Sequence, residues 1–214
     1  MPSLFLPFSA NGKATELAAI EVKRRLGIGA TAVVDPFAVL PTIPARLIDA
    51  SMLTSAMLST CAAEWSGIGF GRIGAAGEEL IALNPTHTEA RQRVTLMEEI
   101  VHIVLDHPKT TLTVRTDGAL AANLISVTSA QPPSPTRARS TSTSSARTYS
   151  ATVEDDAFNI GAACVLPWPE LYNAVHRRHE DTVTIAQRFM VSAELVAFRI
   201  NRAGLARVYK KHHP

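Results

Sequence analysis

The spacing of apolar and polar residues predicts several helices and one short β-region. Apolar residues recur with helical spacing in residues 13–26, 88–106, 154–166, 169–179, 182–189 and 193–203. Five glycines between Gly67 and Gly77 indicate a turn-rich hairpin, and Glu79–Leu83 has the character of a short strand. Residues 47–64 fit a strand or a helix equally well. Together these elements predict an α+β fold that is mainly helical and has a small antiparallel sheet.

One segment breaks this pattern. More than half of residues 126–152 are serine or threonine, several of the others are proline or arginine, and no apolar period runs through them. Such a composition cannot bury enough apolar surface to offset the entropy of ordering. We therefore expect a disordered insert at residues 126–150, which separates residues 1–125 from a C-terminal helical part at residues 151–214.

Composition and charge narrow the class of protein. Hydrophobic residues make up 46% of the 214, which is enough for a core, and the net charge of +2 is too small to indicate nucleic-acid binding by itself. Cys61 and Cys164 fit no metal or redox spacing, so we expect free thiols. No signal peptide is evident, and no apolar run reaches the roughly 18 residues of a membrane span. We expect a soluble, cytoplasmic protein.

Residues 98–102 read Glu-Glu-Ile-Val-His and lie within the predicted helix 88–106, for which Thr88 is the expected N-cap. The stretch differs by one residue from H-E-x-x-H, in which two histidines bind zinc and the glutamate is the general base. Glu98 stands in the place of the first histidine, Glu99 in that of the base and His102 in that of the second histidine. Because residues i and i+4 share a helix face, Glu98 and His102 are candidate metal ligands.

The alternative interpretation is a solvated helix face, on which two glutamates and a histidine are common. Against it, the neighbouring residues are strongly apolar, which favours a buried helix. A buried helix must pair such polar side chains or bind an ion with them.

A catalytic zinc usually has three protein ligands and a water. The best candidate for the third ligand is Glu154, at the start of the predicted helix 154–166. His107 is the rival. It lies five residues after His102, off that face of a straight helix, so it could join only if the helix unwinds before Pro108. An extra carboxylate ligand makes a bound water less acidic and favours harder metals, so the expected cofactor is zinc or another divalent metal such as manganese.

Three segments resemble the ImmA/IrrE family of metallo-endopeptidases. Asn84-Pro85 followed by Arg93-Val-Thr-Leu-Met-Glu-Glu-Ile-Val-His102 is similar to the family's Asn-Pro and Arg-Phe-Thr-Leu-Ala-His-Glu-Leu-Gly-His. Residues 154–167 are similar to its E-x-x-A-N-x-F-A-A-x-L-L-M-P helix, and Val191-Ser192 with the helix after it is similar to its closing segment. The resemblance implies a zincin-like fold and zinc-dependent cleavage of a helix-turn-helix repressor, and hence transcription regulation.

Carried over residue by residue, the resemblance makes Glu99 the general base and His102 and Glu154 metal ligands. Glu98 departs from the family's first histidine ligand, so the alternative is a catalytically inactive member that acts as a protein- or DNA-binding regulator. Tyr149, five residues before Glu154, is a candidate oxyanion donor.

Residues 184–201 also have the pattern of a helix-turn-helix, with Ser192 as the N-cap of the second helix. The start of that helix carries Ala193, Glu194 and Ala197, which suit neither bases nor phosphates. The pattern therefore favours a packed helical hairpin over a DNA reader. The basic residues 207–213 indicate a solvated terminus.

Overall fold

The computed structural model describes residues 5–52, 65–73, 77–107 and 151–213 of the chain. The serine- and threonine-rich segment 126–150, Tyr149 and Cys61 lie outside the described residues, so the predictions made for them are not tested. Cys164 is a buried free thiol.

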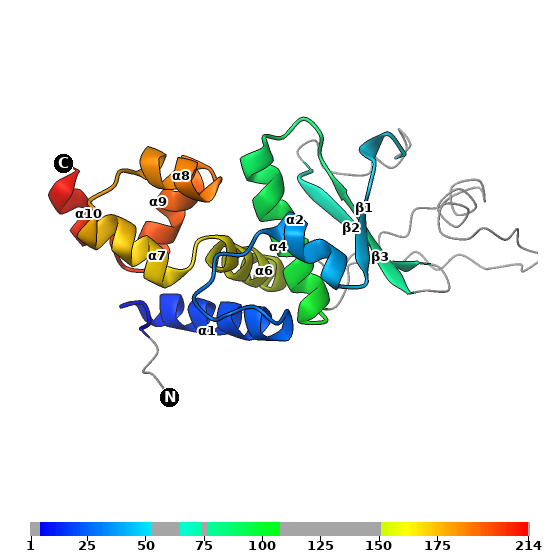
Figure 1. Cartoon of the computed structure of the whole chain (residues 1–214), viewed down its shortest axis with the longest axis horizontal. Coiled ribbons are helices and arrows are strands. Elements are labelled where there is room, and N and C mark those ends of the chain that lie inside the picture. The colour runs from blue at the N-terminus through cyan, green and yellow to red at the C-terminus, as the bar shows by residue number, and fades with distance from the viewer. Residues whose placement is uncertain (1–4, 53–64, 74–76, 108–150, 214) are drawn as a thin grey trace, which may run out of the picture.

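Helices account for most of the described residues (Figure 1). The α-helices are α1 (Ala10–Arg25), α2 (Pro36–Val39), α4 (Glu89–Val104), α6 (Ala151–Val165), α7 (Trp168–Tyr172), α8 (Thr182–Phe189), α9 (Ala193–Arg202) and α10 (Ala206–His212). The shorter turns are the 3-10 helices η1 (Leu40–Thr42) and η2 (Ala50–Met52) and the π-helix η3 (Asn173–Arg177). The strands are β1 (Ala45–Ile48), β2 (Gly67–Ile73) and β3 (Glu78–Leu83). No described helix combines the length and apolar character needed to cross a membrane.

The three described strands form one sheet in the order β1-β3-β2. The predicted hairpin is confirmed, because β2 pairs antiparallel with β3. The expectation of a purely antiparallel sheet was wrong, since β1 pairs parallel with β3, from Ala45 opposite Glu79 to Ile48 opposite Ala82. Parallel pairing needs a long crossover, and the chain between β1 and β3, which includes β2, supplies it. The sheet is therefore mixed, and the α+β class is confirmed.

Side-chain caps fix where the main helices begin. The hydroxyl of Thr88, the expected cap of α4, accepts a hydrogen bond from the N–H of Arg91, and Ser192 caps α9 in the same way through Leu195. The sequence did not predict α10. That helix is held in part by its tyrosine, since the N–H of Thr182 donates to the Tyr209 hydroxyl over 3.1 Å.

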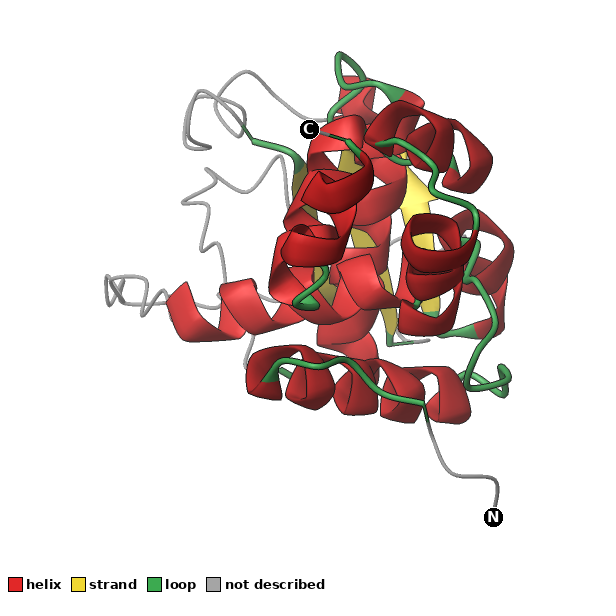
Figure 2. Ribbon diagram, turned by 90° about the vertical axis from the view of Figure 1, so that its left-hand side faces the viewer, coloured by secondary structure: helices red, strands yellow, loops and turns green. Residues whose placement is uncertain are grey.

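Helix α4 lies between the sheet and α6, so it is covered on two sides (Figures 1 and 2). Four of its apolar side chains, Leu96, Met97, Ile100 and Val101, are fully buried. Helix α1 packs against the far side of α6. Because α4 is covered on two sides, its buried polar side chains must face either the sheet or α6. Polar side chains of α4 are found on both of these sides.

A buried ion pair ties the C-terminal helices to α1. Arg199 of α9 and Glu16 of α1 are almost fully buried, with Arg199 Nη2 3.0 Å from Glu16 Oε2. The other oxygen, Glu16 Oε1, accepts the backbone N–H of Trp168 over 2.9 Å. The guanidinium also donates to the carbonyl of Leu166, at the junction of α6 and α7. One pair of charges thus fixes three segments that are distant in sequence.

We expect Arg199→Met to destabilise the protein strongly, because it leaves the Glu16 carboxylate buried without its cation. Breaking such a pair typically lowers the free energy of unfolding by about 3–5 kcal/mol. Urea unfolding followed by circular dichroism measures the change. The matched control is Arg24→Met, which removes a solvent-exposed ion pair with Glu21 and should leave the midpoint nearly unchanged. Equal effects of the two variants would contradict the structural role of the buried pair.

Candidate metal centre

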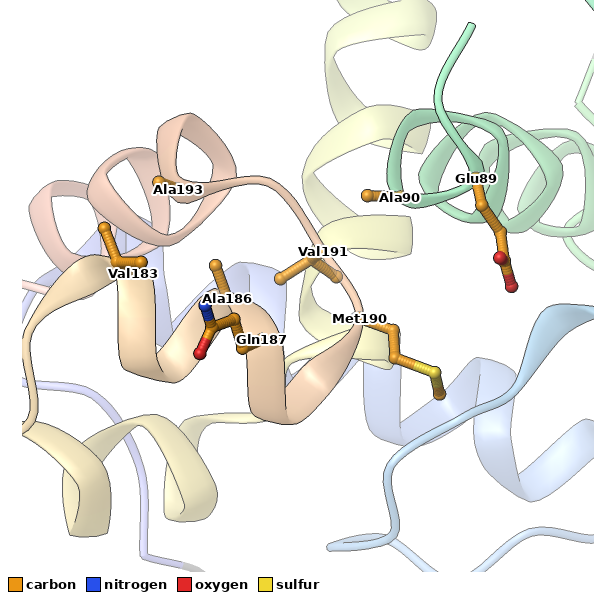
Figure 3. Close-up of a pocket in the computed structure, with 8 residues that line it drawn as sticks. All are labelled: Glu89, Ala90, Val183, Ala186, Gln187, Met190, Val191 and Ala193. Atoms are coloured by element: carbon orange, nitrogen blue, oxygen red, sulfur yellow. The ribbon is translucent and has the colours of Figure 1, made fainter.

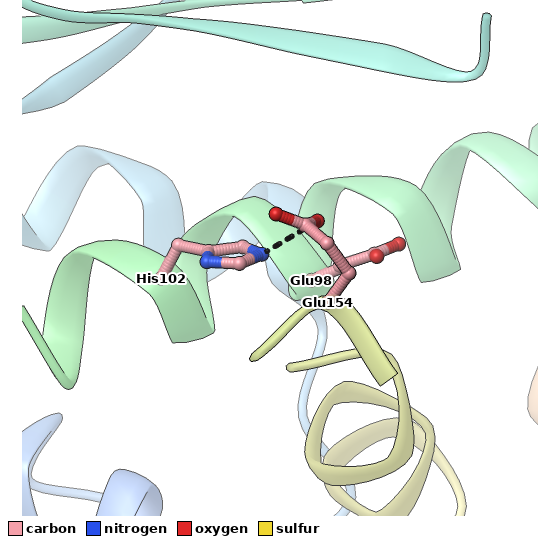
Figure 4. A group of neighbouring side chains, drawn as sticks. All are labelled: Glu98, His102 and Glu154. Carbon is pink, nitrogen blue, oxygen red and sulfur yellow. Dashed lines mark ion pairs between the residues drawn. The ribbon is translucent and has the colours of Figure 1, made fainter. Parts of the chain in front are cut away.

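Helices α4 and α6 bring three potential metal ligands together (Figure 4). Glu98 and His102 lie one turn apart on α4, and Glu154 lies in the first turn of α6. One ligand atom from each lies within 4.8 Å of the other two. His102 Nε2 lies 3.4 Å from Glu154 Oε2. The convergence expected from the sequence is therefore present in the fold.

A glycine permits the close approach that this convergence needs. Gly161 of α6 faces α4, and a Cβ added there would lie 3.1 Å from the backbone nitrogen of Glu98. Glu154 precedes Gly161 by seven residues, which is two helical turns, so both lie on the same face of α6. Because the helix backbones nearly touch at Gly161, the Glu154 carboxylate can reach His102.

Glu99, the residue after Glu98 on α4, points toward the edge strand β2. A Cβ at Gly69 would lie 2.8 Å from Glu99 Oε2, and one at Gly67 would lie 3.5 Å from Glu99 Oε1. Gly69 leaves the space that the carboxylate occupies, whereas a Cβ at Gly67 would first meet Thr95 Cγ2, at 2.5 Å. The sequence pattern by itself indicates only turn residues at these two positions. Alternate residues of a strand lie on the same face, so Gly67 and Gly69 share one face of β2. This spacing is the feature of the sequence that could have indicated room for a side chain against that face.

Burial makes ionisation of the two adjacent glutamates unfavourable. Burial, together with the nearby carboxylates of Glu99 and Glu154, raises the pKa of Glu98 to about 8. Burial and the Glu154 carboxylate likewise raise the pKa of Glu99 to about 7. The pKa of His102 is lowered, mainly by burial, although Glu154 opposes the shift. A neutral imidazole has a lone pair available for a metal, and a nearby cation would favour the ionised form of the carboxylates. Together these groups form a set of ligands suited to a divalent metal.

His107 contacts His102 from the other side of its ring. The two Nδ1 atoms are 3.2 Å apart, and the rings meet edge to face with centroids 5.1 Å apart. Helix α4 ends at Val104, before Pro108, as the sequence required for His107 to come near. The contact is at Nδ1 of His102, whereas Glu154 lies at Nε2. His107 is accordingly not part of the group of three.

The family model of the IrrE N-terminal-like domain, Peptidase_M78, matches residues 67–126. The match supports membership of the ImmA/IrrE family. The matched segment includes β2, β3 and α4, and hence Glu98, Glu99 and His102, while Glu154 lies beyond it. A search of curated proteins found no match. ImmA/IrrE proteins are of a zinc-metallopeptidase type, and the Glu-His-Glu group supplies ligand types that zinc accepts.

A cavity away from the three candidate ligands is unsuited to such chemistry (Figure 3). It has a volume of about 410 Å³ between the start of α4 and the α8–α9 hairpin. Its lining residues are Glu89, Ala90, Val183, Ala186, Gln187, Met190, Val191 and Ala193. Glu89 is the one titratable group among them, so this cavity lacks the ligands and the acid–base pair of a metallopeptidase centre.

The raised pKa of Glu98 predicts a pH dependence for metal-free protein. The folded state retains the Glu98 proton up to about pH 8, whereas the carboxyl in the unfolded chain, with a pKa of 4.5, loses it. The folded state therefore binds more protons in this window, and its stability falls as pH rises. We expect the free energy of unfolding of wild type, minus that of Glu98→Gln, to decrease from about pH 5 to about pH 8. Urea titrations with a chelator present measure it, and a difference that stays constant or rises would contradict the burial of this carboxyl.

Proposed function

We propose that this chain is a metal-dependent endopeptidase of the ImmA/IrrE type, with Glu98, His102 and Glu154 as its metal ligands. The observation that carries the proposal is the convergence of these three side chains on one face of the α4–α6 contact. The family match, which covers the segment with Glu98, Glu99 and His102, supports the same assignment.

Glu99 is the proposed general base. A divalent cation held by the three ligands would polarise a peptide carbonyl and acidify a water. In that arrangement Glu99 would accept a proton from the water as the water oxygen attacks the carbonyl carbon. It then returns the proton to the leaving amine nitrogen as the C–N bond breaks. In the metal-free site the pKa of Glu99 is raised to about 7, toward the range suited to accepting and returning a proton near neutral pH.

Two carboxylates and one imidazole distinguish this site from one with two histidines. The carboxylates of Glu98 and Glu154 balance the charge of a divalent cation, which weakens its effect on a bound water. They also suit a harder metal, so the proposed cofactor is zinc or another divalent metal such as manganese.

The proposed substrate is a protein, and by family resemblance a helix-turn-helix repressor in the cytoplasm, which would make the chain a transcription regulator. Glu98 in the place of a histidine favours one alternative, a catalytically inactive member that binds a protein. An inactive member that binds DNA directly through α8 and α9 is less well supported than one that binds a protein. Glu194 is exposed in the first turn of α9 and would repel the phosphates of DNA.

If Glu99 is the base, Glu99→Gln should abolish hydrolysis while leaving the metal in place. The amide keeps the size of the side chain but cannot accept the proton, and general-base catalysis contributes about 100-fold or more. Cleavage of a casein peptide mixture, followed by mass spectrometry, measures the loss, and elemental analysis measures the metal. Glu89→Gln, an exposed change in the same helix, is the control and should retain activity. Equal activity in wild type and Glu99→Gln would rule out this role.

Glu98→His tests the altered ligand directly. It creates two histidines one turn apart on α4, so we expect zinc to bind more tightly, by about 10–100-fold. A competition titration against a fluorescent chelator measures the dissociation constant. Weaker or unchanged zinc binding in Glu98→His would show that Glu98 does not occupy a ligand position.

A further inference from the structure

His107 is brought back onto His102 by the way in which α4 ends. Leu105 is the C-cap, and Asp106 has a positive φ of 52°, the left-handed conformation that turns the chain at a helix end. The N–H of Asp106 donates to the carbonyl of Ile103 over 3.3 Å, and the N–H of His107 donates to the carbonyl of His102 over 3.0 Å. These two bonds form a Schellman motif.

The motif normally places an apolar contact between its first and last residues. Here those two residues are His102 and His107, and the contact is a polar one between two ring nitrogens 3.2 Å apart. Asparagine and aspartate tolerate the left-handed conformation better than most non-glycine residues. Asp106 thus lets the chain turn at the position that sets the histidine pair.

The hydrogen bond at Nδ1 determines which nitrogen of His102 is free. A metal at Nε2 needs the lone pair of that atom, so the proton of a neutral His102 ring must lie on Nδ1. His102 Nδ1 then donates, and His107 Nδ1 accepts while the proton of its ring lies on Nε2. Both rings stay neutral, so this arrangement adds no charge to a site that already holds Glu98, Glu99 and Glu154.

We propose that His107 is a positioning residue, which holds the ring and tautomer of His102 so that Nε2 faces Glu98 and Glu154. The proposal rests on the metal-binding role of His102 proposed above. A carboxylate in this place would also accept from Nδ1, but it would add a further negative charge beside three carboxyl groups. A neutral imidazole acceptor avoids that repulsion.

Two variants of the full chain separate the hydrogen bond from the packing of the ring. His107→Phe keeps a ring against His102 but removes the nitrogen, and His107→Asn keeps a polar group near the position of Nδ1. Zinc affinity is measured by chelator competition at one pH. We expect His107→Phe to bind zinc about 10–100-fold more weakly than wild type, as is common when a ligand loses its orienting partner. His107→Asn should recover most of the loss.

A second readout needs no metal. Nitrogen-15 NMR of the histidine rings in metal-free protein should show one hydrogen-bonded Nδ1 signal for His102 in wild type and His107→Asn, and a mixture of tautomers in His107→Phe. The proposal is overturned if His107→Phe matches wild type in both measurements, or if His107→Asn is as impaired as His107→Phe. If wild type binds no zinc, the proposed function fails, and the NMR comparison alone then decides the role of His107.

Discussion

The close contact between α4 and α6 is the constraint on which the site depends. Glu98 and His102 come from one helix and would share a face in any fold that kept α4 helical. Glu154 joins them only because Gly161 lets the two backbones approach to van der Waals distance. The buried pair of Glu16 and Arg199 supports this geometry from a distance, since it anchors α1 and α9 at the end of α6. The candidate metal centre thus depends on helix packing more than on any one motif.

Burial of the acidic groups links the packing to the chemistry. The half-buried carboxyl groups of Glu98 and Glu99 have raised pKa values because their charged forms lose solvation. Metal-free protein can relieve this loss of solvation by binding protons, whereas a divalent cation would relieve it at Glu98 without a proton. Glu99 is turned toward Gly67 and Gly69 of β2 and is not one of the three converging side chains.

Much of the site could be predicted from sequence because it depends on local spacing. Thr88 marked the start of α4, and the four-residue spacing placed Glu98 with His102. Glu154 needed a resemblance to a known family, since no spacing rule relates two separate helices. The parallel pairing of β1 and the left-handed turn at Asp106 could not be predicted, because both depend on contacts between residues that no periodic pattern connects. For that reason the sequence suggests His107 as a rival metal ligand, whereas in the structure His107 contacts Nδ1 of His102, on the side of the ring away from Glu154.

The most direct test of the account is the metal content of the purified full-length chain after incubation with zinc and removal of the excess. Elemental analysis should find about one equivalent of zinc in wild type, as three protein ligands can hold one ion. His102→Ala and Glu154→Gln should each lose most of it, while the exposed control His176→Ala should keep it. Wild type without zinc, or zinc retained in full by His102→Ala, would contradict the claim that α4 and α6 together form a metal centre.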